Sequence, residues 1–465
     1  MSRDNQNATI SREELSIPQV RALFQGQVIA PGDHGYDKAR TVVVGGIDRH
    51  PAVIIRVANA DDVARAIALA RDTGLELAVR SGGHSGLGHG TTEGGILLDL
   101  SLMKALEIDV EGRTAWAETG LTAGEYTAAV SAHGLATGFG DTGSVGIGGI
   151  TLGGGIGYLV RKHGMTIDNL LAAEIVTADG QLLYTDAENH SDLFWAIRGG
   201  GGNFGVATRF KFRLHEVNTI VGGMLVLPAT ADVVRGFMAA AQAAPEELSA
   251  IVNVMTAPPM PFLPPEAHGK LIVMALMVYV GDVEAGQRAL APFRALAEPL
   301  ADMLRPMPYA EMFPPEEGEY HPTTVGRTLF LNTIGQDEAE TIMHYLETSD
   351  APFRVAQLRV LGGAMARVPV EATAYAHRHA PIMATVVAFY TGPEERQVRE
   401  AWVNEFAAAL NPPDSSAYVN FLGNEAGTST RDAYPAATWE RLAAIKARYD
   451  PTNLFRLNHN IPPAG

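Results

Sequence analysis

The sequence predicts an α+β protein with two domains, the second of which is built on a large antiparallel sheet. The chain has 465 residues, which exceeds the length that one hydrophobic core usually serves. Up to Leu214, short strand patterns alternate with helix patterns, as is typical of a mixed domain. After Val217 the strand-like runs become longer, and helix-like stretches separate several of them. This pattern favours one broad antiparallel sheet with helices on one face.

The first part of the chain opens with a β-α-β pattern. A strand is predicted over 53–57, and a helix over 60–71 follows because Asp61 and Asp62 place acids in its first turn. The next strand, 75–79, leads directly into a glycine-rich loop. The other elements expected before Leu214 are a strand over 96–100, a helix over 123–133 and a hairpin over 175–183 that turns at Asp179-Gly180.

The second part predicts a series of strands with helices between them. The strands are expected over 222–227, 249–255, 271–280, 327–333, 354–361 and 383–390, and the helices over 231–243, 283–297, 337–348 and 394–409. Residues 257–265 are rich in proline and predict a loop. A last helix over 439–448 precedes the C-terminal tail. A broad sheet of this kind can close a substrate site over a cofactor.

The first glycine-rich tract, residues 80–90, follows a predicted strand. Its glycines allow the backbone to approach a ligand closely and to point N–H groups at an anion. Arg80 adds a charge that would pair with phosphate, and His84 places an imidazole where a phosphate-bearing cofactor would pass. The alternative is a glycine-rich turn with an incidental histidine.

The second tract, residues 138–157, interleaves its glycines with Val, Ile and Leu. Because glycine loses more backbone entropy on ordering than any other residue, we expect no regular helix or strand here. A disordered linker would be polar, so a buried loop around a flat ligand fits better.

The third tract contains Gly200-x-Gly202-x-x-Gly205, which matches the dinucleotide-binding fingerprint. That fingerprint requires a strand before it and a helix after it. Here a helix pattern at 191–198 precedes the glycines and an alternating strand pattern at 206–214 follows them. We therefore reject a Rossmann site at this position.

The composition excludes several classes of function. A formal net charge of −17 argues against nucleic acid or an anionic membrane as a partner. The chain has no cysteine, so disulfides, thiolate metal sites and cysteinyl cofactor bonds are excluded. The polar segment 1–14 lacks the apolar core of a signal peptide, so a cytoplasmic protein is expected. His377-x-His379 has no third ligand at a metal-site spacing, and we expect no metal there.

The glycine-rich tracts and the C-terminal tail together resemble a known family. The residues that carry the resemblance are Arg80 to Ser85, the Gly153-Gly154-Gly155-x-Gly157 run, residues 161–164, residues 199–204 and the Asn458-x-Asn460-Ile461-Pro462-Pro463 tail. In their order and spacing they are similar to the berberine bridge enzyme-like oxidases, which share the vanillyl-alcohol oxidase fold.

The resemblance implies FAD in an extended pose between the N-terminal domain and the returning tail. It implies an FAD-binding domain of two subdomains over 1–217, a substrate-binding domain over 218–424 and a C-terminal return over 425–465. The residues that it places at the cofactor are Arg80, Ser81, Gly82, Gly83, His84, Ser85, Gly88, His89, Thr142, Val145, Gly146, Gly148, Gly149, Gly153, Gly154, Gly157, Val176, Asn458 and Asn460.

His84 matches the histidine that the family bonds covalently to the flavin. Relatives with a second covalent link use a cysteine, and Thr142 occupies that position here. The resemblance therefore implies FAD held by one covalent bond, through His84. Val145 stands where a bulkier residue tends to block oxygen in relatives, which favours an oxidase.

Two departures from the family concern the catalytic base. The tyrosine base of many relatives aligns with Phe421, and the acidic base of others aligns with Arg359, so neither position can accept a proton at neutral pH. The replacements considered are Tyr158, Tyr320, His321, His377 and Tyr418. If the segment around Tyr418 is a regular strand, Tyr418 and Phe421 lie on opposite faces and Tyr418 points away. Gln357 and Arg359 share one strand face and are expected to contact the substrate, in which Arg359 would favour a carboxylate or a polarised carbonyl.

The predicted function is an FAD-linked oxidase that transfers hydride from a small organic substrate to flavin N5 and reduces dioxygen to hydrogen peroxide. Amines are favoured, because a neutral amine needs no protein base. The alternatives are an FAD dehydrogenase or an oxidative cyclase of secondary metabolism that uses oxygen poorly, and a non-catalytic flavin-binding protein. The sequence leaves the substrate and the oligomeric state open.

Overall fold

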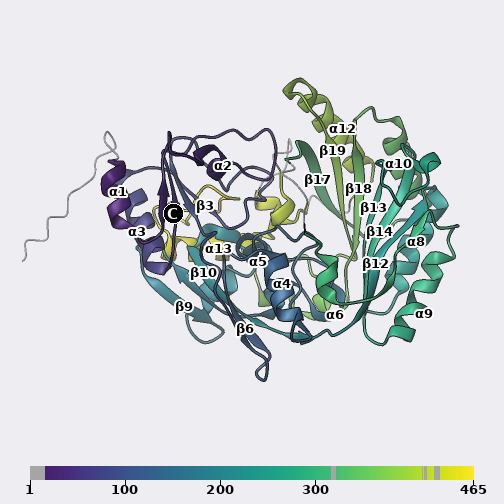
Figure 1. The fold of residues 1–465 in the computed structure, drawn as a ribbon, viewed down its shortest axis with the longest axis horizontal. Helices are drawn as coiled ribbons and strands as arrows, with labels where there is room; N and C mark the ends of the chain where they lie inside the picture. The colour runs from purple at the N-terminus through teal and green to yellow at the C-terminus, as the bar shows by residue number, and fades with distance from the viewer. Residues whose placement is uncertain (1–15, 316–320, 411, 413–415, 424–429) are drawn as a thin grey trace, which may run out of the picture.

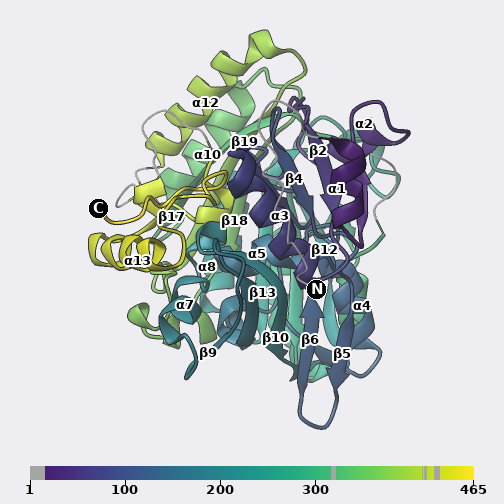
Figure 2. The same cartoon turned by 90° about the vertical axis from the view of Figure 1, so that its left-hand side faces the viewer.

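The computed structural model describes residues 16–315, 321–410, 412, 416–423 and 430–465. Its largest sheet stands on one side of the molecule, and the smaller sheets built from the first half of the chain stand on the other (Figure 1). The C-terminal helix returns to the side of the smaller sheets (Figure 2). The predicted α+β class and the large antiparallel sheet are confirmed.

The first sheet has four strands in the order β1-β2-β4-β3, with β2 and β3 both parallel to β4. The predicted β-α-β unit is present, and helix α3 begins where the Asn59 side chain accepts a hydrogen bond from the Asp62 amide. The elements of this region are α1 (Ile17–Leu23), β1 (Gln27–Ile29), α2 (Tyr36–Arg40), β2 (Val53–Arg56), α3 (Ala60–Thr73), β3 (Leu77–Arg80) and β4 (Ile96–Asp99).

The second sheet has five antiparallel strands in the order β5-β6-β10-β8-β9. The predicted hairpin is formed by β8 and β9, whose connection passes through Asp179 and Gly180. The elements are β5 (Leu106–Asp109), β6 (Thr114–Glu118), α4 (Ala123–Ser131), α6 (Val160–His163), β8 (Leu170–Val176), β9 (Leu182–Asp186), α7 (Ser191–Ala196) and β10 (Val206–Arg213), together with a short pair of β7 (Leu135–Ala136) and β11 (His215–Glu216).

One prediction about the second glycine tract is wrong. Residues Ile147–Gly153 form a helix, α5, although three of its seven residues are glycine. Five of those residues are buried, so tertiary packing offsets the entropy that glycine loses on ordering. The helix ends at Gly154, whose φ of +145° is open to glycine and costly for other residues.

The third sheet has eight strands, of which seven follow the order β15-β12-β14-β13-β18-β19-β17, while β16 pairs with β12. Its strands are β12 (Ile220–Pro228), β13 (Leu248–Thr256), β14 (Leu271–Val280), β15 (Ala301–Asp302), β16 (Arg305–Met307), β17 (Thr324–Leu331), β18 (Arg354–Val360) and β19 (Ile382–Phe389), and all their pairings are antiparallel. Helices α8 (Ala231–Ala243), α9 (Val283–Arg294), α10 (Gln336–Thr348) and α12 (Arg396–Ala409) accompany it, as does the short α11 (Ala364–Arg367).

Strand alternation gives the large sheet one helix-covered face and one face toward the smaller sheets. Ala356, Leu358 and Val360 of β18 lie in the core beneath α8 and α10, whereas Gln357 and Arg359 project from the opposite face. The predicted shared face of Gln357 and Arg359 is therefore confirmed. In β19 the same alternation directs Thr385 and Val387 into a cavity between the sheets.

The last helix, α13 (Ala436–Tyr449), packs against α7 and leads into the tail. None of the helices in the described ranges combines the length and apolar character needed to cross a bilayer.

Candidate active site

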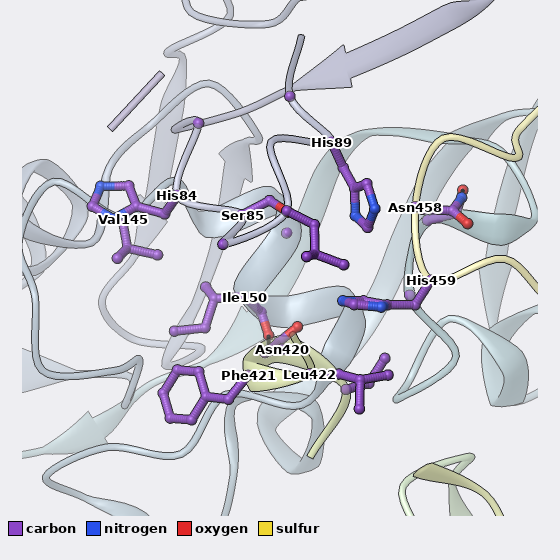
Figure 3. A pocket seen from close by; sticks show the side chains of 18 of the residues that line it. His84, Ser85, His89, Val145, Ile150, Asn420, Phe421, Leu422, Asn458 and His459 are labelled. Atoms are coloured by element: carbon purple, nitrogen blue, oxygen red, sulfur yellow. Dashed lines mark hydrogen bonds between the residues drawn. The ribbon is translucent and has the colours of Figure 1, made fainter. Parts of the chain in front are cut away.

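A cavity of about 570 Å³ lies where the glycine-rich tracts, the large sheet and the C-terminal tail meet. In Figure 3, His84 and Val145 lie toward one end of this cavity, whereas Asn458 and His459 lie toward the other. The lining comes from residues 80–90, the segment around α5, residues 201–207, strands β17 and β19, helix α12, residues 418–423 and residues 455–459. Segments distant in sequence therefore build one elongated site.

The loop after β3 is held by Arg80, whose side chain is bonded within the protein. Its buried guanidinium donates hydrogen bonds to Asp99 Oδ2 at 2.8 Å, to the Thr41 carbonyl at 3.2 Å and to the Ala39 carbonyl. The charge of Arg80 is thus paired inside the protein, although the residue also lines the cavity. The predicted pairing of Arg80 with a cofactor phosphate is not supported by this geometry.

The first and second glycine tracts touch directly. A Cβ atom on Gly82 would stand 2.2 Å from the Gly146 nitrogen, and one on Gly146 would stand 2.3 Å from the Gly82 nitrogen. Ser81 Oγ donates to the Thr119 carbonyl at 2.6 Å and accepts from the Gly148 amide at 3.2 Å. These contacts join the two tracts into one wall of the cavity.

His84 lies in this wall, and its Nε2 atom is 2.9 Å from Ser144 Oγ. The hydrogen bond fixes the imidazole against the second glycine tract. Thr142, two residues before Ser144, and Val145, the residue after it, also line the cavity. The side chains assigned to the reactive end of the cofactor are thus gathered at one place.

The opposite end is closed by His89 and His459, whose rings meet edge to face at 5.0 Å. Burial lowers the pKa of His89 to about 4, with help from the charge of Arg49, and burial next to His89 lowers the pKa of His459 to about 3. Both imidazoles are therefore neutral at pH 7. The contact joins the N-terminal loop to the C-terminal tail across the cavity.

The structure places most of the predicted cofactor residues in the lining. Those found there are Arg80, Ser81, Gly82, Gly83, His84, Ser85, His89, Thr142, Val145, Gly146, Gly148, Gly149 and Asn458. The others lie behind the wall: Gly88, Gly153, Gly154, Gly157, Val176 and Asn460. Gly153 has a packing reason for its missing side chain, since a Cβ there would stand 1.9 Å from Asn420 Oδ1.

Tyr418 does not lie on a strand, and the prediction that it points away is wrong. It precedes a short 3₁₀ turn at Val419–Phe421, and Tyr418 and Phe421 both line the cavity with their rings 5.3 Å apart. The Tyr418 hydroxyl accepts hydrogen bonds from the Gly155 amide and from Asn420 Nδ2, each at 2.8 Å. Burial raises the pKa of Tyr418 to about 12, so it is a neutral phenol at pH 7.

Tyr158 lies outside the lining. It is buried against Phe313, with the two rings 5.8 Å apart, and its hydroxyl donates to the Asp141 carbonyl at 3.5 Å. Burial raises the pKa of Tyr158 far above its ordinary value. The structure therefore gives Tyr158 a packing role.

Two further candidates for the base, His321 and His377, are also outside the lining. His321 Nδ1 lies 3.0 Å from the Val42 carbonyl, and His377 Nε2 lies 3.0 Å from the Ala433 carbonyl while its ring stacks on Phe330. Tyr320 lies outside the described residues. Within the described part of the chain, the side chains form no cluster of three or more groups that could hold a metal.

Gln357 and Arg359 lie behind the cavity wall, and Asp141 lies in front of them. Arg359 Nη2 is 2.7 Å from Asp141 Oδ2 and 2.8 Å from Gln357 Oε1, while Gln357 Nε2 donates to Asn253 Oδ1 at 2.9 Å. The guanidinium is thus engaged by the protein, which weighs against the predicted contact of Arg359 with a substrate carboxylate. Asp141 was missed, although an acid next to Gly140 in an apolar glycine tract is a signal that could have found it.

Comparisons with known proteins agree with this site. An FAD binding domain model matches residues 51–186, and a berberine and berberine-like model matches residues 417–462. (R)-6-hydroxynicotine oxidase of Paenarthrobacter nicotinovorans is 29% identical over 457 residues, which cover 95% of this chain and 98% of that protein. An FAD-linked oxidoreductase of Bacillus subtilis, YvdP, is 30% identical over 453 residues, which cover 94% and 98%. The chain belongs to the berberine bridge enzyme-like FAD-linked oxidoreductases.

Solved structures of the family share the fold. The crystal structure of 6-hydroxy-D-nicotine oxidase from Arthrobacter nicotinovorans superposes with a TM-score of 0.84 at 28% identity, covering 95% of this chain and 98% of that one. Xylooligosaccharide oxidase from Myceliophthora thermophila superposes with a TM-score of 0.83 at 23% identity, covering 97% and 99%. The family assignment makes the protein an FAD oxidoreductase.

The residues present fit FAD. The cavity is of a size typical of cofactor sites, and Gly82, Gly83 and Gly146 in its wall would let the backbone approach a ligand closely. At the tail, Asn458 lines the cavity and keeps a buried Oδ1 atom that no donor reaches within the described residues. Such an acceptor costs free energy when it is unpaired, and a hydroxyl or N–H group of FAD can satisfy it.

Proposed function

We propose that this FAD oxidoreductase is an oxidase of a small organic substrate, anchored to its cofactor through His84. Bound FAD supplies a two-electron acceptor for hydride from a substrate carbon and passes the electrons to dioxygen, which yields hydrogen peroxide. Residues 1–217 and 425–465 hold the cofactor in this proposal, and residues 218–424 cover the substrate. We also propose that the protein acts in the cytoplasm.

The observation that carries the proposal is the single cavity that joins the His84 loop to the inner face of the large sheet. The loop and the tail supply a cofactor-sized channel, while Thr385, Val387 and Phe421 add a mostly apolar wall at which a substrate can lie. The protein thus shields the reacting carbon from water and orients it.

The hydrogen bond between His84 and Ser144 supports the covalent anchor. It holds the imidazole in one orientation in the cavity wall, which is what bond formation to a bound ligand requires. Thr142 lines the same wall and cannot form a thioether, so one covalent bond is expected.

The first experiment is denaturation of the purified protein in acid, followed by mass spectrometry of the chain. We expect the yellow colour to stay with the pellet and the chain to be heavier by one FAD. His84→Ala should release the colour, whereas the matched control His89→Ala, in the same loop, should retain it. Colour released by the unmodified protein would contradict the covalent anchor.

A second experiment addresses substrate and oxidant. A panel of amines, alcohols, phenols and sugars is mixed with the protein without oxygen, and bleaching of the flavin is recorded. The similarity to (R)-6-hydroxynicotine oxidase places amines first in the panel. Steady-state release of hydrogen peroxide on admission of air would support an oxidase, and bleaching without peroxide would identify a dehydrogenase.

A further inference from the structure

Asp141 is a carboxylate in the cavity wall at a place where the sequence indicated no catalytic group. Its side chain is 20% exposed, whereas that of its ion-pair partner Arg359 is 5% exposed. The lining contains one other acid, Glu400 of α12, whose side chain is 36% exposed and pairs with Arg396. Of the two carboxylates in the described lining, Asp141 therefore has the less exposed side chain.

The position of Asp141 along the cavity follows from the chain. Ser144, three residues later, is hydrogen-bonded to His84, and the Cα atom of Asp141 lies within roughly 11 Å of the Cα atom of Ser144. Phe421, which stacks against the Arg359 guanidinium at 5.2 Å, lies in the same half of the cavity as His84 in Figure 3. Asp141 thus stands at the end where the proposed anchor holds the reactive part of the cofactor.

The two oxygens of Asp141 differ in how firmly they are held. Oδ2 lies 2.7 Å from Arg359 Nη2, while among the described residues Oδ1 receives only a long 3.4 Å contact from the Thr142 hydroxyl. Arg359 is itself fixed, since its Nε and Nη2 atoms donate to Gln357 Oε1 at 3.1 and 2.8 Å and its Nη1 donates to the Ile156 carbonyl at 3.4 Å. One oxygen is therefore anchored and the other is available at the cavity.

We infer that Asp141 is the proton acceptor of this active site and that Arg359 is its positioning residue. The inference rests on the proposed function, which names no catalytic base, and it assigns that role to Asp141. As the C–H hydride leaves the substrate carbon for bound FAD, the N–H or O–H bond on the adjacent heteroatom breaks. Its electron pair forms the new C=N or C=O bond, and its proton passes to Asp141 Oδ1. The substrate class is thereby widened from amines to alcohols.

The other titratable groups around Asp141 do not compete for this role. Tyr158 and Tyr309 lie near its carboxylate from the segment after α5 and from the turn at Tyr309–Met312. Burial raises the pKa of both phenols far above the ordinary value, with the charge of Asp141 as a lesser cause. Arg359 from β18 supplies a fixed positive charge, and His84 faces the same end of the cavity.

The test uses the flavin-loaded enzyme and its Asp141→Asn variant, with the compound that bleaches the flavin most rapidly in the anaerobic panel. Asparagine preserves the shape and an oxygen acceptor for Arg359 but removes the basic oxygen. We expect the rate constant of anaerobic flavin reduction at pH 7.5 to fall by about 10²- to 10⁴-fold. We also expect the acidic limb of its pH profile to disappear.

A second readout needs no turnover. Benzoate is titrated into the oxidised enzyme and its binding is followed by the flavin absorbance and by calorimetry. Removing the carboxylate in Asp141→Asn exposes the Arg359 charge to the cavity, so benzoate should bind at least tenfold more tightly. Arg359→Gln leaves the carboxylate uncompensated and should weaken benzoate binding, and Arg359→Lys should restore most of the unmodified affinity and pH profile.

The matched control is Asp168→Asn, which breaks the pair between Asp168 Oδ2 and Arg378 Nη1 at 2.8 Å outside the cavity lining. A purely structural Asp141 would behave as this control does, with a lower melting temperature but unchanged benzoate affinity and pH profile. That result, or an Asp141→Asn enzyme reduced at the normal rate with its acidic limb intact, would overturn the inference. If no compound bleaches the unmodified enzyme, the proposed oxidase function fails, and the opposite shifts in benzoate affinity still decide where Asp141 lies.

Discussion

At the scale of single residues, the site depends on glycines that lack a Cβ atom as much as on particular side chains. Gly82 and Gly146 approach each other so closely that neither can carry a Cβ without moving backbone. Their contact aligns His84 with Ser144, and so it prepares the proposed covalent anchor. The sequence shows these glycines as two separate tracts, and the structure shows that each is required by the other.

Replacing Gly82 with alanine tests this contact. The new methyl group would stand 2.2 Å from the Gly146 nitrogen, and the required backbone shift should cost about 1–3 kcal/mol of unfolding free energy. Gly86→Ala in the same loop is the control, since a Cβ there meets nothing within 4 Å. Thermal unfolding and flavin content are measured for both, and equal stability of the two variants would contradict the close contact.

At the scale of elements, α13 fixes the tail that closes the cavity. Lys446 and Asp450 near its C-terminal end are fully buried, with Lys446 Nζ 2.6 Å from Asp450 Oδ2. Lys446 also donates to the Asn203 and Phe455 carbonyls, and Asp450 accepts from the Leu454 and Phe455 amides. This network joins the helix, the third glycine tract and the start of the tail.

Lys446→Met should therefore be strongly destabilising, because it leaves the Asp450 carboxylate buried without its counter-charge. The expected loss is about 3–5 kcal/mol, measured by urea unfolding. Lys104→Met removes a lysine from the exposed pair with Glu125, where both side chains are 42% exposed, and should cost less than about 1 kcal/mol. Similar losses in the two variants would show that the buried network does not hold the tail.

At the scale of the whole molecule, stability depends on histidines that are held neutral. His163 of α6 and His215 of β11 stack at 4.0 Å, and His215 Nε2 lies 2.6 Å from Asn169 Oδ1. Burial lowers the pKa of His163 to about 3 and that of His215 to about 4, with the neighbouring histidine, Lys162 and Arg213 as lesser causes. The two stacked rings link α6 to β11, where the first half of the chain meets the large sheet.

Acid should therefore destabilise the protein well above the range in which carboxylates titrate. The unfolded chain binds protons at these histidines near pH 6.5, whereas the folded chain does so only near pH 3–4. Their contribution is complete above pH 6.5 and is lost as the pH falls toward 4, by at most about 1.4 kcal/mol per imidazole for each pH unit. Urea unfolding at pH 7.5, 6 and 5 measures the slope, which should be smaller in His163→Asn; an unchanged slope would contradict this role.

The sequence alone determined the class of the protein. Strand alternation and helix periodicity located the large antiparallel sheet and its helices, because burial on one face imposes those periods on the chain. The glycine-rich tracts and the tail identified the FAD family, and the family models match the segments that contain the first two tracts and the tail. His84 and most of the other residues that this resemblance placed at the cofactor do line the cavity.

The tertiary structure decided which side chains reach the cavity and which are already paired. The sequence predicts that Arg80 and Arg359 bind a ligand through their charge. In the folded protein, however, Arg80 is paired with Asp99 and Arg359 is paired with Asp141. Helix α5 forms from a glycine-rich segment because its surroundings bury it. Charge pairing and burial depend on residues far apart in the chain. Local pattern therefore determines the fold and the cofactor class, and only the packed molecule places Asp141 in the cavity wall.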